Sequence, residues 1–156
     1  MNRYAERTEV PSDRSRAEIE RTLRRYGATQ FAYGWDHNNA TIMFEIAQRC
    51  VLFRLPLPDR NAAEFTMTKR PGVARTESAA ENLYEQAVRQ RWRALALVIK
   101  AKLEATAVGI TTIEQEFLAH IVLPGGRTVG EHTAPAIAAA YESGRVPALL
   151  PGGDVR

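Results

Sequence analysis

The sequence predicts an α+β fold: an N-terminal helix, a three-stranded antiparallel meander, one long helix and a small helical C-terminal segment. Two observations support this prediction. Three short runs with alternating apolar residues lie between residues 29 and 57 and are joined by short connections, as in successive β-hairpins. Residues 78–108 are rich in alanine and leucine and carry a broad apolar band, which is typical of a long helix. The expected core is therefore of the β-β-β-α type.

The N-terminal helix is expected to follow a flexible arm. Residues 1–14 should form that arm, because they are polar, mixed in charge and interrupted by Pro11. Ser15 and Glu18 have the spacing of a capping box, so the helix is expected to begin at Ser15. Gly27 is suited to end it, because glycine tolerates positive φ. One apolar stripe repeats along the helix: Ile19, Leu23 and Tyr26.

The three strands are expected at residues 29–35, 40–46 and 49–57. Alternation places Phe31, Tyr33 and Trp35 on one face of the first strand. An aromatic face of this kind can stack nucleic-acid bases. It can equally pack beneath a helix as part of the core, so both interpretations stay open.

The long helix is predicted to carry more apolar surface than one sheet can cover. Its expected start is the capping box of Ser78 and Glu81, and Gly109 is expected to end it. From Ala94 to Ile99 the helix is apolar on nearly all sides. That stretch needs cover on more than one side, and a three-stranded sheet leaves edges to be paired or protected. Both features predict a homo-oligomer.

The last third of the chain, residues 109–156, is predicted to be a helical extension that packs on the core or on a neighbouring subunit. A helix is expected over residues 111–122, with a capping box of Thr111 and Glu114 at its start. A second, alanine-rich helix is expected over residues 133–143, with Gly144 as its C-cap. The apolar tail at residues 147–151 is expected to pack on a neighbouring surface.

Composition indicates a single soluble domain with a moderate basic excess. The 156 residues contain 21 Lys and Arg against 18 Asp and Glu, a net charge of +3. Residues 1–108 hold most of the excess, with 18 basic against 13 acidic side chains. Arginine dominates, which suits bidentate phosphate contacts, although a GC-rich genome would also favour arginine. No apolar leader or membrane-spanning run is visible, so we expect a protein of the bacterial host cytoplasm.

The sequence contains no catalytic, cofactor-binding or metal-binding motif, so we expect no enzyme activity, no cofactor and no metal. The single cysteine, Cys50, lies in a strand pattern and is expected to be a packed thiol. Glu116 and His120 share a face of a predicted helix and could offer two metal ligands, but no third ligand has matching spacing. His37 and His132 are expected at a turn and near a helix start.

The residues most suited to binding are basic. The connection over residues 58–76 has no clear periodicity, and a connection this long is often functional or disordered. A surface that follows phosphates is expected from eight residues: Arg24, Arg25, Arg60, Lys69, Arg70, Arg75, Arg89 and Arg93. Tyr33 and Trp35 would add base stacking. The alternative is a set of solvated charges with local partners such as Glu85.

Two segments resemble small uncharacterised proteins of bacteriophages and prophages. They are residues 17–28 and residues 116–124, together with the end of the chain at Leu149-Leu150-Pro151. The order of three strands and a long helix is also similar, in topology, to the core of Rad52-type single-strand annealing proteins. This topological likeness implies binding of single-stranded DNA in recombination.

The function expected from these features is that of a phage-type protein that binds nucleic acid, single-stranded DNA rather than duplex, through arginine contacts and without bond chemistry. The alternative is a phage structural or inhibitory protein. In that case the long helix and the apolar tail bind a protein partner from the phage or its host.

Overall fold

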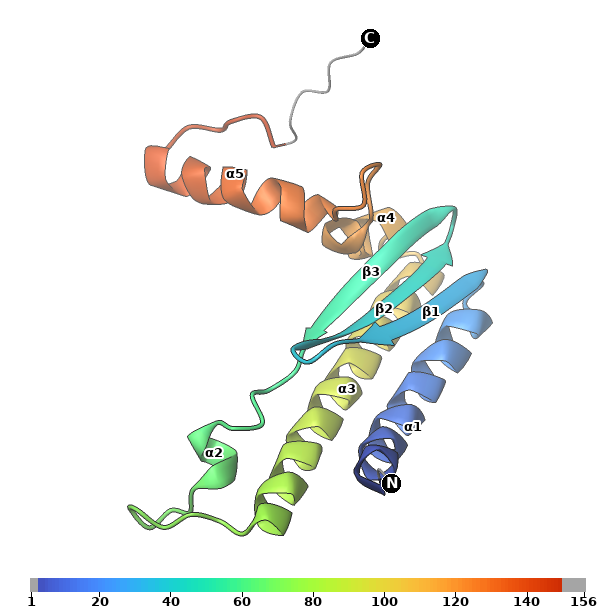
Figure 1. Ribbon diagram of the computed structural model, residues 1–156. Helices are drawn as coiled ribbons and strands as arrows, with labels where there is room; N and C mark the ends of the chain where they lie inside the picture. Colours follow the sequence, from blue (N-terminus) through green and yellow to red (C-terminus); the bar gives the residue numbers. More distant parts are fainter. Residues whose placement is uncertain (1–2, 150–156) are drawn as a thin grey trace.

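The computed structural model describes residues 3–149, with side chains described from residue 13 onward. The fold is α+β, in the predicted order. The strands β1 (Gln30–Trp35), β2 (Asn39–Ile46) and β3 (Arg49–Pro56) form one antiparallel sheet in the order β1-β2-β3. The helices α1 (Arg3–Arg25) and α3 (Glu77–Ala107) lie side by side on one face of this sheet (Figure 1). Among the described residues, no helix covers the other face.

The sheet has one apolar face, which is set by strict alternation along β2. Ile42, Phe44 and Ile46 are buried, whereas Met43 between them is 42% exposed on the open face. The register places Phe31 and Val51 opposite Phe44. The helices cover this apolar face with the side chains that complete the core: Ile19, Leu23, Trp92, Leu95, Ile99 and Leu103.

Two tight turns join the strands. The Asp36 carboxylate accepts the Asn38 and Asn39 amides at 2.7 and 2.8 Å, which fixes the β1–β2 turn. The two-residue β2–β3 turn places Ala47 and Gln48 at φ 48° and 60°. Positive φ at both central residues matches the type I′ hairpin turn, which suits the twist of the sheet.

The predicted flexible arm is wrong from Arg3 onward, because α1 begins there rather than at Ser15. Ser15 lies inside the helix and is therefore not its N-cap. The segment before Ser15 contains good helix formers such as Ala5 and Glu6. Pro11 lacks an amide hydrogen, but this removes only one helical hydrogen bond, and the helix continues through it.

The start of α3 also differs from the prediction. Thr76 is the N-cap, and its hydroxyl accepts the Ala79 amide at 3.2 Å, so Ser78 lies in the first turn. Leu95, Ala96 and Ile99 face the core, whereas Leu97 and Val98 are 61% and 44% exposed. The predicted excess of apolar surface on this helix is therefore present.

The basic connection over residues 58–76 is ordered. It contains the short helix α2 (Ala63–Thr66), whose Phe65 packs edge-on against Tyr84 of α3, with ring centres 5.7 Å apart. A small hairpin-like excursion follows, closed by the bridge between Met67 and Ala74.

The helix predicted over residues 111–122 is wrong beyond its first turn. The chain forms α4 (Ile113–Glu116), then the 3-10 turn η1 (Leu118–His120), and then pairs with the edge of β3. The capping box joins Thr112 with Gln115 rather than Thr111 with Glu114. Phe117 is fully buried and meets the rings of Phe44 and Phe53 edge-on, so tertiary packing ends the helix.

Three groups occupy the outer edge of β3. The Val122 amide donates to the Cys50 carbonyl at 2.9 Å, and the Arg91 guanidinium donates to the Pro56 carbonyl. The His120 imidazole hydrogen-bonds the Leu52 backbone between them. Cys50 itself is half-buried, as expected for a packed thiol.

The last helix, α5 (Val129–Ser143), begins earlier than predicted because Thr128 and Glu131 form a capping box. Gly144 ends it in the left-handed conformation, as predicted. Its first turn packs on η1, where a Cβ at Gly130 would lie 2.9 Å from the Ala119 carbonyl oxygen. The rest of α5 extends away from the sheet and buries no residue (Figure 1). The predicted apolar tail is described only as far as Leu149; Leu150 and Pro151 lie outside the described residues.

Candidate nucleic-acid interface

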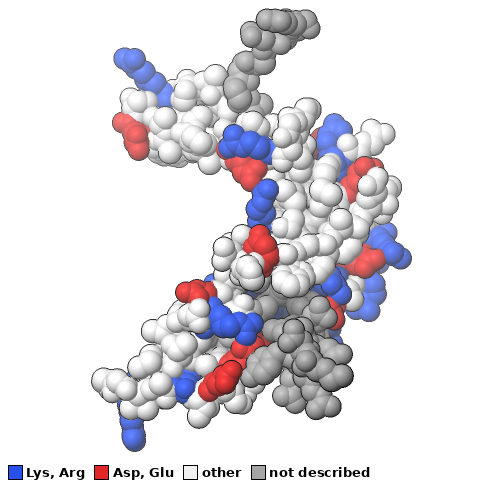
Figure 2. Space-filling view, viewed as in Figure 1, with Lys and Arg blue, Asp and Glu red and all other residues white. Residues whose placement is uncertain are grey.

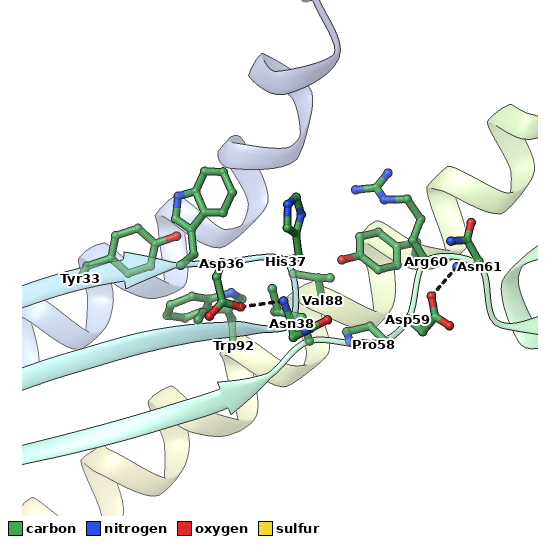
Figure 3. A pocket seen from close by; sticks show the side chains of 14 residues that line it. Tyr33, Asp36, His37, Asn38, Pro58, Asp59, Arg60, Asn61, Val88 and Trp92 are labelled. Carbon is green, nitrogen blue, oxygen red and sulfur yellow. Dashed lines mark hydrogen bonds between the residues drawn. The ribbon is translucent and has the colours of Figure 1, made fainter. Parts of the chain in front are cut away.

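A pocket of about 620 Å³ lies at one end of the sheet (Figure 3). The β1–β2 turn, the segment that follows β3 and the N-terminal half of α3 meet there. Its lining is unusually aromatic, with Tyr33 and Trp35 from β1 and Tyr84 and Trp92 from α3. Val88 lies between the two α3 aromatics, so all three occur at four-residue spacing on one helix face.

The two tryptophans differ greatly in exposure. Trp92 is buried, with its ring centre 5.6 Å from that of Tyr33 and the planes tilted by 55°. Trp35 lies at the end of β1 and is 65% exposed. Phe31 and Tyr33 are half-buried against the core. The aromatic face of β1 thus contributes both to the core and to the exposed pocket.

Charged groups surround the aromatic lining. The Arg60 guanidinium lies over the Tyr84 ring, 4.2 Å from its centre, and forms an ion pair with Glu81. Arg16 of α1 does not line the pocket, but its guanidinium lies 4.5 Å from the centre of the ring of Tyr33, which does. Hydrogen bonds from the Asn38 and Asn39 amides hold the pKa of Asp36 below its ordinary value, so this carboxylate at the pocket is ionised at neutral pH.

A shallower pocket of about 430 Å³ adjoins the first and shares Arg60 with it. Arg75 also lines this second pocket and is half-buried. Its Nε is buried without a hydrogen-bond partner, a condition that no other described side-chain nitrogen or oxygen shares. Buried donors are normally paired, so an acceptor from a bound molecule would satisfy this atom.

The structure separates the remaining predicted basic residues. Lys69 and Arg70 are exposed on the hairpin-like excursion, and Arg89 and Arg93 are exposed on α3. Arg89 pairs loosely with Glu85, at 4.0 Å, as the alternative interpretation expected. Lys and Arg alternate with Asp and Glu on the face shown in Figure 2, which carries no continuous basic surface.

Arg24 and Arg25 lie at the opposite end of the sheet from the pocket. They end α1 just before Thr29, whose amide donates to the Glu45 carbonyl beside the β2–β3 turn. Arg24 pairs with Glu20 at 2.8 Å, and Arg25 lies over the Tyr26 ring. The structure therefore brings Tyr33, Trp35, Arg60 and Arg75 to one end of the molecule, without these two arginines.

The metal-ligand pair considered from sequence does not converge. Glu116 pairs with Lys102, at 3.3 Å, and the His120 ring stacks on Phe53 at 3.9 Å. In the part of the chain with described side chains, no group of three or more His, Cys, Asp or Glu is placed to hold a metal ion. Burial lowers the pKa of His120, which favours its neutral form in the folded protein.

Sequence reasoning did not assign Tyr84, Trp92 and Arg16 to the site. The two aromatics belong to the apolar band of α3, and their eight-residue separation on one helix face was the available signal. The contact of Arg16 with Tyr33 joins α1 to β1 and has no local signal.

Over residues 3–149, no helix is long and apolar enough to cross a membrane. Comparison of the chain with protein-family models, with curated proteins and with solved structures finds no match.

Proposed function

We propose that this protein binds single-stranded nucleic acid, DNA in the first place, at the aromatic pocket. The observation that carries the proposal is the exposed indole of Trp35 at the edge of a pocket that also contains Arg60. Aromatic platforms beside cationic groups bind single strands, because every base has a face that can stack. A duplex keeps its bases stacked inside and would not offer them to this pocket.

The charges around the pocket indicate how stacking and phosphate contacts contribute to binding in this proposal. Asp36 and Asp59 line the same pocket as Arg60, so electrostatic attraction there is moderate. Stacking on Trp35 then supplies most of the binding free energy. Arg60 and Arg75 contact backbone phosphates along the adjoining pocket, and Lys69 and Arg70 extend that path. No bond chemistry is involved, and a role in phage recombination by strand annealing rests on the strand–strand–strand–helix order alone.

Replacing Trp35 with alanine tests the stacking contact. Fluorescence anisotropy with a labelled oligothymidine should show a loss of about 1–3 kcal/mol in binding free energy, the range for one stacked base. Arg24→Ala is the matched control, because Arg24 lies at the far end of the sheet and should leave the affinity unchanged. Equal losses in both variants would contradict a localised site, and no binding at low salt would exclude the proposal.

The salt dependence tests the number of phosphate contacts. With one phosphate contact each from Arg60, Arg75, Lys69 and Arg70, the slope of log K against log salt should be about −2.8, from roughly −0.7 per phosphate on a single strand. Intrinsic fluorescence gives a second readout, since binding should quench the exposed Trp35 and leave the buried Trp92 emission unchanged. Trp35→Phe should remove the quenching.

A second candidate function is binding of a protein partner through the long helix, as in a phage structural or inhibitory protein. Exposure of Leu97 and Val98 on α3 favours it, because adjacent exposed aliphatic side chains mark interaction sites. Two results together would favour this function over the first: the protein forms a stable complex with a host or phage protein, and it does not bind nucleic acid.

A further inference from the structure

We propose that α5 of one copy docks on the exposed apolar face of α3 in a second copy. The acceptor surface, here called the α3 strip, consists of Ala94, Leu97, Val98 and Ala101. All four are exposed, and Leu97 has 61% of its surface open to solvent. They repeat at i, i+3, i+4 and i+7, so they form one continuous stripe along the helix. This proposal does not depend on nucleic-acid binding.

The donor surface is α5. None of its residues is buried, although most of them are alanine or larger apolar residues. Ala134, Ile137, Ala138 and Tyr141 are all exposed and have the same i, i+3, i+4 and i+7 spacing. Most helical stability in proteins comes from packing an apolar face rather than from helix propensity. The exposed apolar face of α5 is therefore suited to pack on another surface.

The two surfaces match in length and shape. Each stripe spans eight residues, or roughly 11 Å at about 1.5 Å per residue. Each combines two alanines with two larger side chains, which allows the helices to approach closely. Both stripes are exposed in the same chain, so α5 does not cover the α3 strip of its own molecule. A second copy supplies the missing surface.

The helix dipoles favour an antiparallel arrangement. The C-terminal end of α5, which carries the negative end of its dipole and Glu142, then lies beside Arg93 at the start of the α3 strip. The positive N-terminal end of α5 lies towards Glu104. A parallel arrangement would instead place the negative end of α5 beside Glu104.

The mass of the purified full-length chain, without nucleic acid, tests the contact. Sedimentation or light scattering across a concentration series should show particles larger than a monomer. Leu97→Glu and Ile137→Glu should each reduce the particle to a monomer with an unchanged far-ultraviolet spectrum. Val73→Glu is the control, because Val73 is exposed on the hairpin-like excursion and belongs to neither surface. A monomer at every concentration, or equal effects of all three substitutions, would overturn the proposal.

Cross-linking tests the antiparallel register. In a Cys50→Ser background, a chain with Ala94→Cys is mixed with a chain with Tyr141→Cys and oxidised. We expect a disulfide between the two chains, because antiparallel stripes bring these positions together. Ala101→Cys replaces Ala94→Cys as the comparison and should give a much lower yield. Equal yields would overturn the register, and no cross-link in either mixture would overturn the contact itself.

Discussion

His120 is the residue whose protonation is most closely tied to the C-terminal packing. Its ring stacks on Phe53, and its imidazole hydrogen-bonds the Leu52 backbone at the edge of β3. Burial and the nearby Lys102 ammonium both lower its pKa from 6.5, and they outweigh the hydrogen bond. The folded protein therefore binds fewer protons at His120 than the unfolded chain does.

The sign of this shift predicts a loss of stability on acidification. The contribution of neutral His120 is fully present above the unfolded pKa of 6.5 and is lost as the pH falls below that value towards the lower folded pKa. The melting temperature should fall between about pH 7.5 and 5.5. His120→Gln should flatten this fall, whereas His37→Gln, at an exposed turn, should not. Thermal melts across this range check both; a fall of equal size in His120→Gln would assign the effect to another group.

Among the elements, the start of α3 permits a prediction that separates two candidate caps. Thr76 accepts the Ala79 amide, whereas Ser78 lies in the first turn. Thr76→Ala should lower the free energy of unfolding by about 1 kcal/mol, the usual cost of losing an N-cap. Ser78→Ala should change it little. Chemical denaturation of both variants measures the difference, and the reverse order would restore Ser78 as the cap.

The β2–β3 turn should be open to stabilisation. Ala47 and Gln48 adopt positive φ, which costs a residue with a Cβ roughly 1–2 kcal/mol. Gln48→Gly should raise the free energy of unfolding by up to about 1 kcal/mol. Glycine removes the cost of positive φ, but it also increases the conformational entropy of the unfolded chain, which offsets part of the gain. Gln30→Gly, in the extended backbone of β1, should instead be destabilising. A destabilised Gln48→Gly variant would mean that the side chain has a role that outweighs the strain.

Local pattern predicted the regular elements well and failed where distant contacts decide. Alternation along β2 located the strand and its buried face, because burial on one side imposes a period of two. The helix expected over residues 111–122 had suitable local residues. It ends after one turn because Phe117 packs edge-on against Phe44 and Phe53 and the following residues pair with β3. No pattern within those residues carries that information.

At the scale of the whole molecule, the candidate site was only partly predictable. Tyr33 and Trp35 followed from their alternation on one strand, and Arg60 from its place in the basic connection. Arg24 and Arg25 were grouped with them because sequence gives charge but not the end of the sheet at which it lies. Trp92 and Tyr84 join the pocket through the packing of α3 beneath β1, which only the assembled fold determines.

The two outer edges of the sheet are unequal. On β3, the backbone groups of Cys50, Leu52 and Pro56 are already engaged by Val122, His120 and Arg91. On β1, no described strand pairs with the outer edge. Of the two edges, β1 is therefore the one that no described strand occupies, and it is the edge better suited to accept an added strand. If two copies paired through their β1 strands, the combined sheet would have an occupied β3 edge at each end. Further strands would be added less readily there, so this pairing would favour a dimer over an open-ended fibre.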